Sequence, residues 1–410
     1  MITAEEARRL ILENTPRLGV EKVSLESAGG RILAEDLTAR EDLPSFDNSA
    51  MDGYAVRSVD LAGAAEKNPV ELITRETVKA GDFPRTEVGP GEAFRILTGA
   101  PVPRGADCVV MQEFTRPGAA GKTCFLRTPK AGEHIRRAGE DVRKGAPLLA
   151  VGALVRPYEI GLLAAQGFTD VSVSRKPRVA VLASGDELVP HSAGLQPGKI
   201  RNSNGPAMAA ALRRWKLEVF DAGIVPDNQG ALEARIKELL GQYDILLLSG
   251  GVSVGEFDFC KHALEGAGVR EIFWGVAIKP GKPLWFGIHR PAGGGTPRPV
   301  FGLPGNPVSV LVCVEEFVRG ALEAMEGVEP GHSGFHHAGT AANDYPKDDE
   351  RQRYVFCKVG RNGGEYSVTI IRPQGAAMVG MSCQANALAM RPVGAGPIRK
   401  GDPIKFRWLK

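Results

Sequence analysis

The run YDILLLSGG, residues 243–251, decides the fold of the central part of this chain. Its apolar residues are continuous over 245–248, as they are in RVAVLAS at residues 178–184. A strand is continuously apolar when both faces of its sheet are covered. A further strand pattern, LEVFDAGIV, lies between these runs, flanked by the helix patterns NGPAMAAALRRWK and NQGALEARIKELLGQ. This alternation predicts a mostly parallel, doubly covered α/β sheet over residues 178–327.

The segments on either side of this region have a different pattern. Residues 46–142 are dense in turn residues, and short strand-like runs such as EAFRIL and DCVVMQEF alternate with glycine and proline clusters. This pattern predicts a small β barrel or sandwich. Residues 328–410 return to short strands and turns, whereas residues 1–45 and 143–177 each contain a short helix pattern.

Composition and charge narrow the class of protein. The net charge is +3 over 410 residues and no run of lysine and arginine occurs, so nucleic-acid binding is not indicated. The six cysteines form no C-x-x-C pair, which fits a reducing compartment. Thr3 and Glu6 have the spacing of a helix capping box, and no apolar run is long enough to span a membrane. We therefore expect a soluble cytoplasmic protein without a signal peptide.

Three strand ends in the α/β region carry polar, glycine-bearing loops. They are LASGDEL, with Ser184 and Gly185; LLSGGVSVGEFDF, with Gly250 and Gly251; and FGLPGNPVS. In open parallel sheets, ligands bind beyond the carboxyl ends of the strands. Backbone N–H groups of a glycine loop can approach an anion closely. Together the three ends predict a phosphate-bearing ligand, although each alone also fits a tight turn that requires glycine.

A cationic turn follows in GVAIKPGKP, residues 275–283. Lys279 and Lys282 flank Pro280 and Gly281, a rigid arrangement suited to a phosphate. The stretch is no P-loop, because its glycine spacing is one residue too long and Pro283 stands where that motif needs Ser or Thr. The alternative is a solvated surface turn.

The carboxylates predict oxygen ligands for a metal. We place all of them in glycine- or asparagine-bearing loops and on no helix face: Asp52, Asp141, Glu187, Asp227 and Asp258. Without neighbouring His or Cys clusters, such groups suit Mg²⁺, which often bridges to phosphates. Solvated loop residues or helix caps are the alternative for each.

A serine hydrolase is a competing hypothesis. GVSVG, residues 251–255, matches G-x-S-x-G with Ser253 in the nucleophile position, and Asp258 and His289 follow in the order of a triad. However, an elbow serine directly follows its strand, and here Ser249 and Gly250 intervene after Leu248.

Read together, the motifs resemble one family. The chain is similar over essentially its whole length to the MoeA-type molybdopterin molybdenumtransferases, a family that includes the gephyrin E domain. The resemblance rests on stretches that occur in the order of the family: LPSFDNSAMDGYAV, ILTGAPVPRGADCVVMQE, IRRAGEDV, VAVLASGDELV, LLLSGGVSVGEFDF, AIKPGKPLWFG and GLPGNPVSVLVCVEEFV.

The resemblance implies an elongated subunit with four domains. Residues 1–45 and 143–177 would form one discontinuous domain, into which the β-rich domain 46–142 is inserted. Residues 178–327 would form a MogA-like α/β domain and residues 328–410 a C-terminal β barrel. The family forms homodimers, with a cleft between the α/β domain of one subunit and the inserted domain of the other.

The resemblance also implies the reaction and its residues. Family members act on adenylylated molybdopterin and molybdate, with Mg²⁺-dependent release of AMP to form the molybdenum cofactor. The adenylyltransferase that makes molybdopterin-adenylate and apo-molybdoenzymes are implied as protein partners. The catalytic carboxylates would be the five named above, with Asp227 and Asp258 as metal ligands. The substrate-binding set would be Thr98, Ser184, Gly185, Gly250, Gly251, Ser253, Lys279, Lys282, Pro304 and Pro307.

The chain departs from the family pattern at two places. Gly275 stands where many members carry a lysine, and Gly375, Ala376, Gly380 and Met381 stand where many carry serines. Losing hydroxyl donors weakens an anion site. A tungstate-preferring homologue, or a pterin-binding or scaffold paralogue without turnover, is therefore the alternative to the molybdenum-inserting enzyme.

Overall fold

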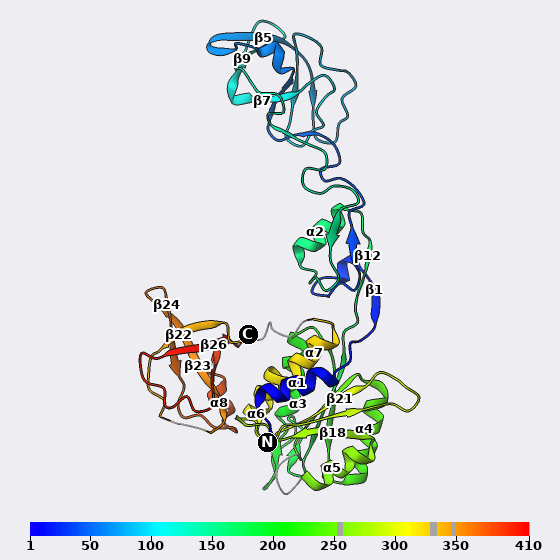
Figure 1. Ribbon diagram of the computed structural model, residues 1–410, viewed down its shortest axis with the longest axis vertical. Coiled ribbons are helices and arrows are strands. Elements are labelled where there is room, and N and C mark those ends of the chain that lie inside the picture. The colour runs from blue at the N-terminus through cyan, green and yellow to red at the C-terminus, as the bar shows by residue number, and fades with distance from the viewer. Residues whose placement is uncertain (252–256, 329–333, 347–349, 410) are drawn as a thin grey trace. The chain divides into compact units, whose positions relative to one another are not determined.

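The computed structural model describes residues 1–251, 257–328, 334–346 and 350–409. The described chain divides into two compact units, which are taken here one at a time. One unit comprises Met1–Glu21 together with Ser174–Lys410, and the other comprises Lys22–Val173 (Figure 1).

A six-stranded sheet organises the first unit. Its strands in spatial order are β16 (Glu218–Val225), β13 (Arg178–Ser184), β17 (Ile245–Ser249), β21 (Arg298–Leu303), β20 (Trp285–His289) and β18 (Val269–Trp274). The first four are parallel, whereas β20 and β18 run antiparallel. The mostly parallel sheet predicted from the sequence is confirmed.

Both faces of this sheet are buried, as the continuous apolar runs require. Alternate residues of one strand enter different cores: Val179 and Val181 join one cluster, and Ala180 and Leu182 join the other. The first core also takes residues from α1 (Ala4–Asn14), α3 (Asn204–Arg214), α6 (Pro307–Cys313), the π-helical η4 (Val314–Val318) and α7 (Arg319–Met325). The second takes residues from α4 (Gln229–Gln242) and α5 (Phe257–Gly266) (Figure 1).

A barrel follows in the same unit. Its strands are β22 (His337–Ala341), β23 (Gln352–Asn362), β24 (Glu365–Ile370), β25 (Ala387–Arg391) and β26 (Pro403–Trp408), and α8 (Val379–Ser382) lies between two of them. The order β23-β24-β22-β26-β25 is closed by the pairing of β25 with β23, which confirms the C-terminal barrel. The short β19 (Ile278–Lys279) adds in parallel to β23 and joins the barrel to the lysine turn.

The second unit is built on another six-stranded sheet. In spatial order its strands are β7 (Cys108–Met111), β4 (Gly53–Val56), β6 (Glu92–Ile96), β5 (Ala65–Val78), β9 (Lys122–Arg127) and β8 (Thr115–Pro117). Two small cores cover its faces. The predicted β-rich character of residues 46–142 is confirmed.

Short elements complete both units. They are β1 (Val20–Ser24) with β12 (Asp170–Ser174), β2 (Leu37–Thr38) with β11 (Pro147–Leu149), β3 (Asn48–Ser49) with β10 (Ile135–Arg136), β14 (Leu188–Val189) with β15 (Ile200–Arg201), α2 (Pro157–Ala165), and the 3-10 turns η1 (Leu25–Ser27), η2 (Ser58–Leu61) and η3 (Gln112–Phe114).

The N-terminal helix shows how local sequence and packing act together. The Thr3 side chain accepts a hydrogen bond from the backbone N–H of Glu6, so the predicted cap at this end is present. Ala4, Ala7 and Ile11 then bury the inner face of α1 in the first core of the α/β sheet. The structure thus groups α1 with the α/β and barrel segments, whereas the sequence placed residues 1–45 in a discontinuous domain. The four-domain division with its boundaries remains a proposal.

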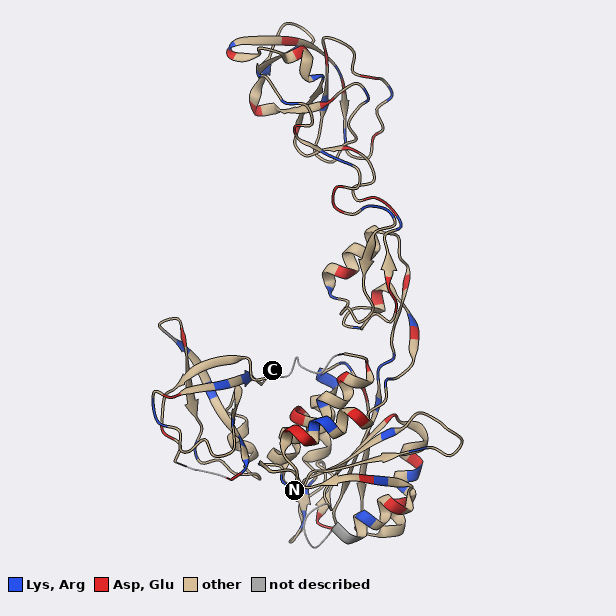
Figure 2. Ribbon diagram, in the orientation of Figure 1, with Lys and Arg blue, Asp and Glu red and all other residues tan. Residues whose placement is uncertain are grey.

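Surface charge follows the ordinary pattern of exposed helices. Acidic and basic residues alternate along α1 and α4, including the pairs Arg9–Glu13 and Lys237–Glu233 (Figure 2). Within the described residues, no helix is both long and apolar enough to cross a membrane.

Candidate functional site

Four parallel strands end at one edge of the α/β sheet. Their register places Ser184, at the end of β13, beside Val225 of β16, and places Ser249, at the end of β17, beside Leu303 of β21. The loops that follow these strands therefore emerge together. This is the edge at which open α/β sheets bind ligands.

Ser184, Asp186 and Asp227 form a hydrogen-bonded cluster at this edge. The buried Ser184 hydroxyl donates to Oδ1 of Asp227 at 2.7 Å. The backbone N–H of Asp186 donates to Oδ2 of Asp227 at 3.3 Å, and the N–H of Asp227 donates to Oδ1 of Asp186 at 3.1 Å. Two carboxylates are thus held side by side by backbone donors. Asp186 was missed by the sequence analysis, although it adjoins Gly185 and Glu187 in the same motif.

Asn204 links two of the loops. Its Nδ2 donates to the Ser249 hydroxyl and to the Gly305 carbonyl oxygen, at 2.8 Å in both cases. Its Oδ1 is buried and has no hydrogen-bond partner in the described part of the chain. A buried acceptor without a donor is costly, and it is therefore a candidate contact for a ligand N–H or O–H. The sequence analysis noted only that a helix begins near this residue.

Gly250 is required by a close approach between two strands. Its φ is +95°, and a Cβ at this position would lie 2.1 Å from the carbonyl oxygen of Ser184. Its N–H donates to the Leu303 carbonyl oxygen at 3.3 Å, so this N–H is already engaged within the protein. The glycine keeps the strand ends close together, and its part in anion binding stays a prediction.

A cationic cavity lies next to these loops. Its volume is about 230 Å³, and the lysine turn, the loop after β21 and the start of β23 line it. Its basic residues are Lys279, Lys282, Arg351 and Arg353. No Asp or Glu is among the described residues that line it. Asn306 lines the same cavity and directly follows Gly305, to which Asn204 is bonded. Arg351 and Arg353 were missed by the sequence analysis.

The loop after β24 forms another wall of this cavity. Gly375, Ala376 and Met381 line it, and these are positions where many relatives were expected to carry serines. The loop is fixed to α6, because the Val308 N–H donates to the Ala376 carbonyl oxygen at 3.0 Å. Gln374 makes hydrogen bonds to both backbone groups of Phe356. Gly375, Ala376 and Met381 thus supply no hydroxyl donor to this wall of the cavity.

The remaining predicted residues of the first unit are placed as follows. Glu187 is exposed after β13, Pro304 is buried after β21, and Pro307 opens α6. Asp258 lies in the first turn of α5, so its assignment to a loop was wrong; its side chain is not described. Ser253 lies outside the described residues.

The proposed hydrolase triad does not fit the sheet. His289 pairs with Arg298 at the start of β21, whereas Ser249 pairs with Leu303 at its end. Five strand residues separate these positions, about 16 Å at 3.3 Å per residue. His289 therefore lies at the edge of the sheet opposite to the end of β17, whereas the base of an elbow serine would be expected beside the strand end.

In the second unit, the predicted residues Asp52 and Asp141 each make hydrogen bonds to residues elsewhere in the chain. Oδ1 of the exposed Asp52 accepts hydrogen bonds from the Thr98 N–H and hydroxyl, both at 2.8 Å. These bonds lower the pKa of Asp52 below its ordinary value, so the carboxylate is charged at neutral pH. Asp141 is exposed, and its N–H donates to the Leu43 carbonyl oxygen at 3.0 Å. Asp47, which pairs with Arg137 at 2.5 Å, was not singled out from the sequence.

The donor set at the sheet edge fits a hard divalent cation in part. Among the described residues, no group of three His, Cys, Asp or Glu side chains could hold a metal ion. Asp186 and Asp227 nevertheless place carboxylate oxygens side by side at the ligand edge. Mg²⁺ typically takes one or two carboxylates and completes its shell with water and substrate phosphate oxygens.

Comparison with known proteins gives consistent matches along the chain. Three family models match in succession: "MoeA N-terminal region (domain I and II)" at residues 2–167, "Probable molybdopterin binding domain" at 180–324, and "MoeA C-terminal region (domain IV)" at 338–408. A molybdopterin molybdenumtransferase of Haemophilus influenzae is 36% identical over 410 residues, covering 98% of each chain. That of Bacillus subtilis is 35% identical, covering 100% of this chain and 94% of the relative.

A solved structure gives the same result for the fold. The crystal structure of a molybdopterin biosynthesis moeA protein from Pyrococcus horikoshii matches with a TM-score of 0.84 and 30% sequence identity, covering 100% of both chains.

Proposed function

Because this chain belongs to the MoeA family of molybdopterin molybdenumtransferases, enzymes of molybdenum cofactor biosynthesis, we propose that it transfers molybdenum from molybdate to adenylylated molybdopterin with release of AMP. In the proposed reaction, the two dithiolene thiols bind molybdenum and their protons carry one oxide of molybdate away as water. A second water cleaves the phosphoanhydride bond of the adenylate, and AMP leaves. The observation that carries the proposal is the cationic cavity beside the strand-end carboxylates.

The cavity supplies the charge that anionic substrates need. Its four basic residues belong to segments far apart in sequence and face a space of about 230 Å³. Charge-assisted hydrogen bonds from lysine and arginine to phosphate or oxyanion oxygens are stronger than neutral ones. We therefore assign Lys279 and Lys282 to the binding of oxyanion or phosphate oxygens. Arg351 and Arg353 join them in this assignment.

The strand-end loops would orient the remainder of the substrate. Asn204 Oδ1, buried without a partner among the described residues, would accept a hydrogen bond from the pterin or ribose. Asp227 and Asp258 would hold Mg²⁺, which supplies neutralisation of phosphate charge when it is bound. Asp227 is kept in place for this role by the Ser184 hydroxyl and the Asp186 N–H.

The other predicted residues remain proposals. Asp52 and Asp141 are proposed as functional carboxylates, with Thr98 fixing the carboxylate of Asp52. We further propose a homodimer, which sedimentation would test. A cytoplasmic location is proposed because the described residues contain no disulfide bond. The molybdopterin adenylyltransferase and apo-molybdoenzymes are the proposed protein partners.

The direct test is AMP release by the purified full chain with Mg²⁺, adenylylated molybdopterin and molybdate. We expect Asp258→Asn and Lys282→Ala each to reduce release at least about tenfold, which corresponds to about 1.4 kcal/mol of barrier. Lys237→Ala is the matched control, because this exposed lysine pairs with Glu233 on α4 and does not line the cavity. Release at the wild-type rate by both site variants would refute the assignment.

A second candidate is favoured by the missing hydroxyl donors at Gly375 and Ala376. A tungstate-preferring enzyme, or a pterin-binding scaffold without turnover, would retain the fold. Running the assay with molybdate and tungstate side by side distinguishes these cases. Faster release with tungstate indicates the former, and pterin binding without release of AMP indicates the latter.

A further inference from the structure

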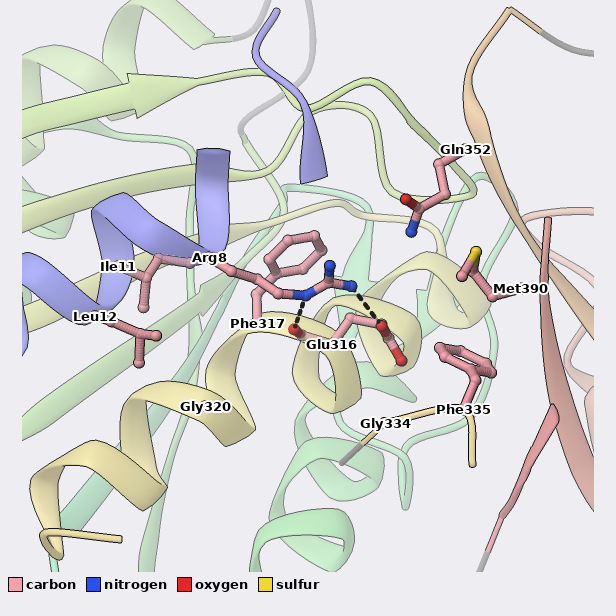
Figure 3. Close-up of a pocket in the computed structure, with 10 residues that line it drawn as sticks. All are labelled: Arg8, Ile11, Leu12, Glu316, Phe317, Gly320, Gly334, Phe335, Gln352 and Met390. Atoms are coloured by element: carbon pink, nitrogen blue, oxygen red, sulfur yellow. Dashed lines mark hydrogen bonds and ion pairs between the residues drawn. The ribbon is translucent and has the colours of Figure 1, made fainter. Parts of the chain in front are cut away.

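A second cavity lies within the first unit, and it shares no residue with the cationic cavity. Its volume is about 370 Å³. It is lined by Arg8, Ile11 and Leu12 of α1, by Glu316 and Phe317 of η4 and Gly320 of α7, and by Gly334, Phe335, Gln352 and Met390 of the C-terminal region (Figure 3). Three segments far apart in the sequence thus enclose one space, whose volume is in the range of small-molecule sites.

The walls of this cavity are mainly apolar. Ile11 and Phe317 are 1% exposed, and Leu12, Phe335 and Met390 face the same space. Figure 3 shows Phe335 and Met390 on the side opposite to Ile11 and Leu12. A guest would bury apolar surface against both sides, and such burial contributes about 25 cal/mol per Å².

The two charged residues that line the cavity, Arg8 and Glu316, belong to a larger network of ion pairs. Arg8 pairs with Glu316 at 2.9 Å, and Arg407 pairs with Glu316 at 2.7 Å and with Glu315 at 3.0 Å. Arg214 pairs with Glu315 as well. The network therefore contains three arginines and two carboxylates, a net charge of +1.

Several donors of the same network have no hydrogen-bond acceptor in the described part of the chain, and Oε1 of Glu316, ion-paired with Arg407, has no hydrogen-bond donor there. Arg8 uses Nε and Nη2 for the Glu316 carbonyl oxygen, the Glu316 carboxylate and the Tyr354 hydroxyl. Its Nη1 has no acceptor among the described residues. Nε of Arg407, a side chain only 7% exposed, is buried without a hydrogen-bond partner in the same described part. Arg407 also stacks on the ring of Phe335, a wall of the cavity, at 5.6 Å. Unsatisfied donors beside a positive charge favour an anionic acceptor.

We propose that this cavity binds a small amphipathic monocarboxylate. The carboxylate would accept hydrogen bonds from Nη1 of Arg8, and the apolar body would lie between Ile11 and Leu12 on one side and Phe335 and Met390 on the other. The charge of the ligand would balance the +1 of the arginine network. This site is additional to the proposed substrate site.

The test is calorimetric binding of 3-phenylpropionate to the full chain, without molybdopterin or molybdate. We expect a dissociation constant of about 1 mM or lower. The neutral amide, 3-phenylpropanamide, should bind at least about tenfold more weakly, because it has the same shape but no charge. No detectable binding of the acid at about 10 mM, or equal binding of acid and amide, would overturn the proposal.

A cavity-filling variant shows where the ligand binds. Gly320 lines the cavity on α7, and a Cβ there would meet no atom within 4 Å, so Gly320→Leu starts a side chain in open space at the cavity wall and removes a helical glycine. We expect this change to weaken binding at least about tenfold. Gly161→Leu is the matched control, because Gly161 is a helical glycine of α2 with equally open surroundings outside the cavity. Unchanged binding to the Gly320 variant would show that the ligand binds elsewhere. Neither result depends on AMP release, so this test can fail or succeed independently of the proposed function.

Discussion

The hydroxyl of Tyr354 accepts a hydrogen bond from Nη2 of Arg8 at 2.8 Å, across 346 positions of sequence. A second bond comes from Nε2 of Gln352 at 2.7 Å. Burial raises the pKa of Tyr354 far above its ordinary value, so the phenol stays neutral. Tyr354 lines the cationic cavity, whereas Arg8 and Gln352 line the other cavity. The Tyr354 side chain therefore links the wall of the cationic cavity to the wall of the second cavity.

Removing this hydroxyl should destabilise the first unit. Tyr354→Phe keeps the ring but leaves the two donors without their acceptor, and we expect a loss of about 1–3 kcal/mol in the free energy of unfolding, measured with denaturant. Tyr158→Phe is the control, since Tyr158 is 81% exposed, and we expect a change within about 0.5 kcal/mol. Equal stability of the two variants would show that the bridge contributes nothing.

Restoring a hydroxyl to the cationic cavity should strengthen anion binding. Ala376→Ser places a donor in the wall of the cavity, and we expect molybdate binding to tighten by about two- to tenfold, as one hydrogen bond of about 0.5–1.5 kcal/mol gives. Gly380→Ser tests the same exchange at a position that does not line the cavity, and it should leave the affinity unchanged. Equal effects of both changes would argue against this cavity as the anion site.

The Ser184–Asp227 pair should matter for turnover more than for stability. We expect Asp227→Asn to lower AMP release at least about tenfold, because the amide carries no charge for a cation. Asp221→Asn, in the middle of β16, removes a carboxylate that accepts a hydrogen bond from the nearby Gly223 N–H, and it should retain the wild-type rate. If both variants kept full activity, Asp227 would have no part in the reaction.

The close approach at Gly250 should not tolerate a side chain. Gly250→Ala combines a positive φ with a contact of 2.1 Å to the Ser184 carbonyl oxygen, so we expect a loss of at least about 2 kcal/mol in the free energy of unfolding. Gly241→Ala, near the end of α4, meets open space and should be neutral or stabilising by up to about 1 kcal/mol. Denaturant titration of the two variants measures the difference.

The pH dependence of stability should include Asp244. Burial alone would raise the pKa of this carboxyl, but hydrogen bonds from Arg175 and from the Arg178 N–H, with the charges of both arginines, lower it below its ordinary value. A lowered pKa stabilises the fold above the unfolded-state value of about 3.9, and this stabilisation is lost as pH falls through the folded-state value.

The Tm difference between wild type and Asp244→Asn should therefore be largest near neutral pH and should shrink below about pH 4. Glu13→Gln is the control, because its pair with Arg9 is exposed and contributes little. A difference that does not change with pH would contradict the assigned ion pair.

The sequence predicted the layers of the fold better than the contacts of the site. Continuous apolar runs identified β13 and β17, because strands buried on both faces need such runs. The proximity of Arg353 to the lysine turn could not be predicted from the sequence, since it depends on the pairing of β19 with β23 across a long stretch of intervening chain. The hydrogen bond of the Gly250 N–H could not be predicted for a similar reason, because its partner, Leu303, belongs to another strand. Local patterns reveal strands and caps, whereas contacts between strands depend on the assembled fold.

The pairing of β19 with β23 has a consequence for how this enzyme class can diversify. Of the four basic residues that line the cationic cavity, Lys279 and Lys282 belong to the α/β region, and Arg351 and Arg353 belong to the barrel region. Asp186 and Asp227 both belong to the α/β region. Under the proposed function, exchange of the barrel would alter which oxyanion the cavity admits and would leave Asp186 and Asp227 unchanged. Selectivity for the metal and chemistry on the nucleotide would then be inherited separately.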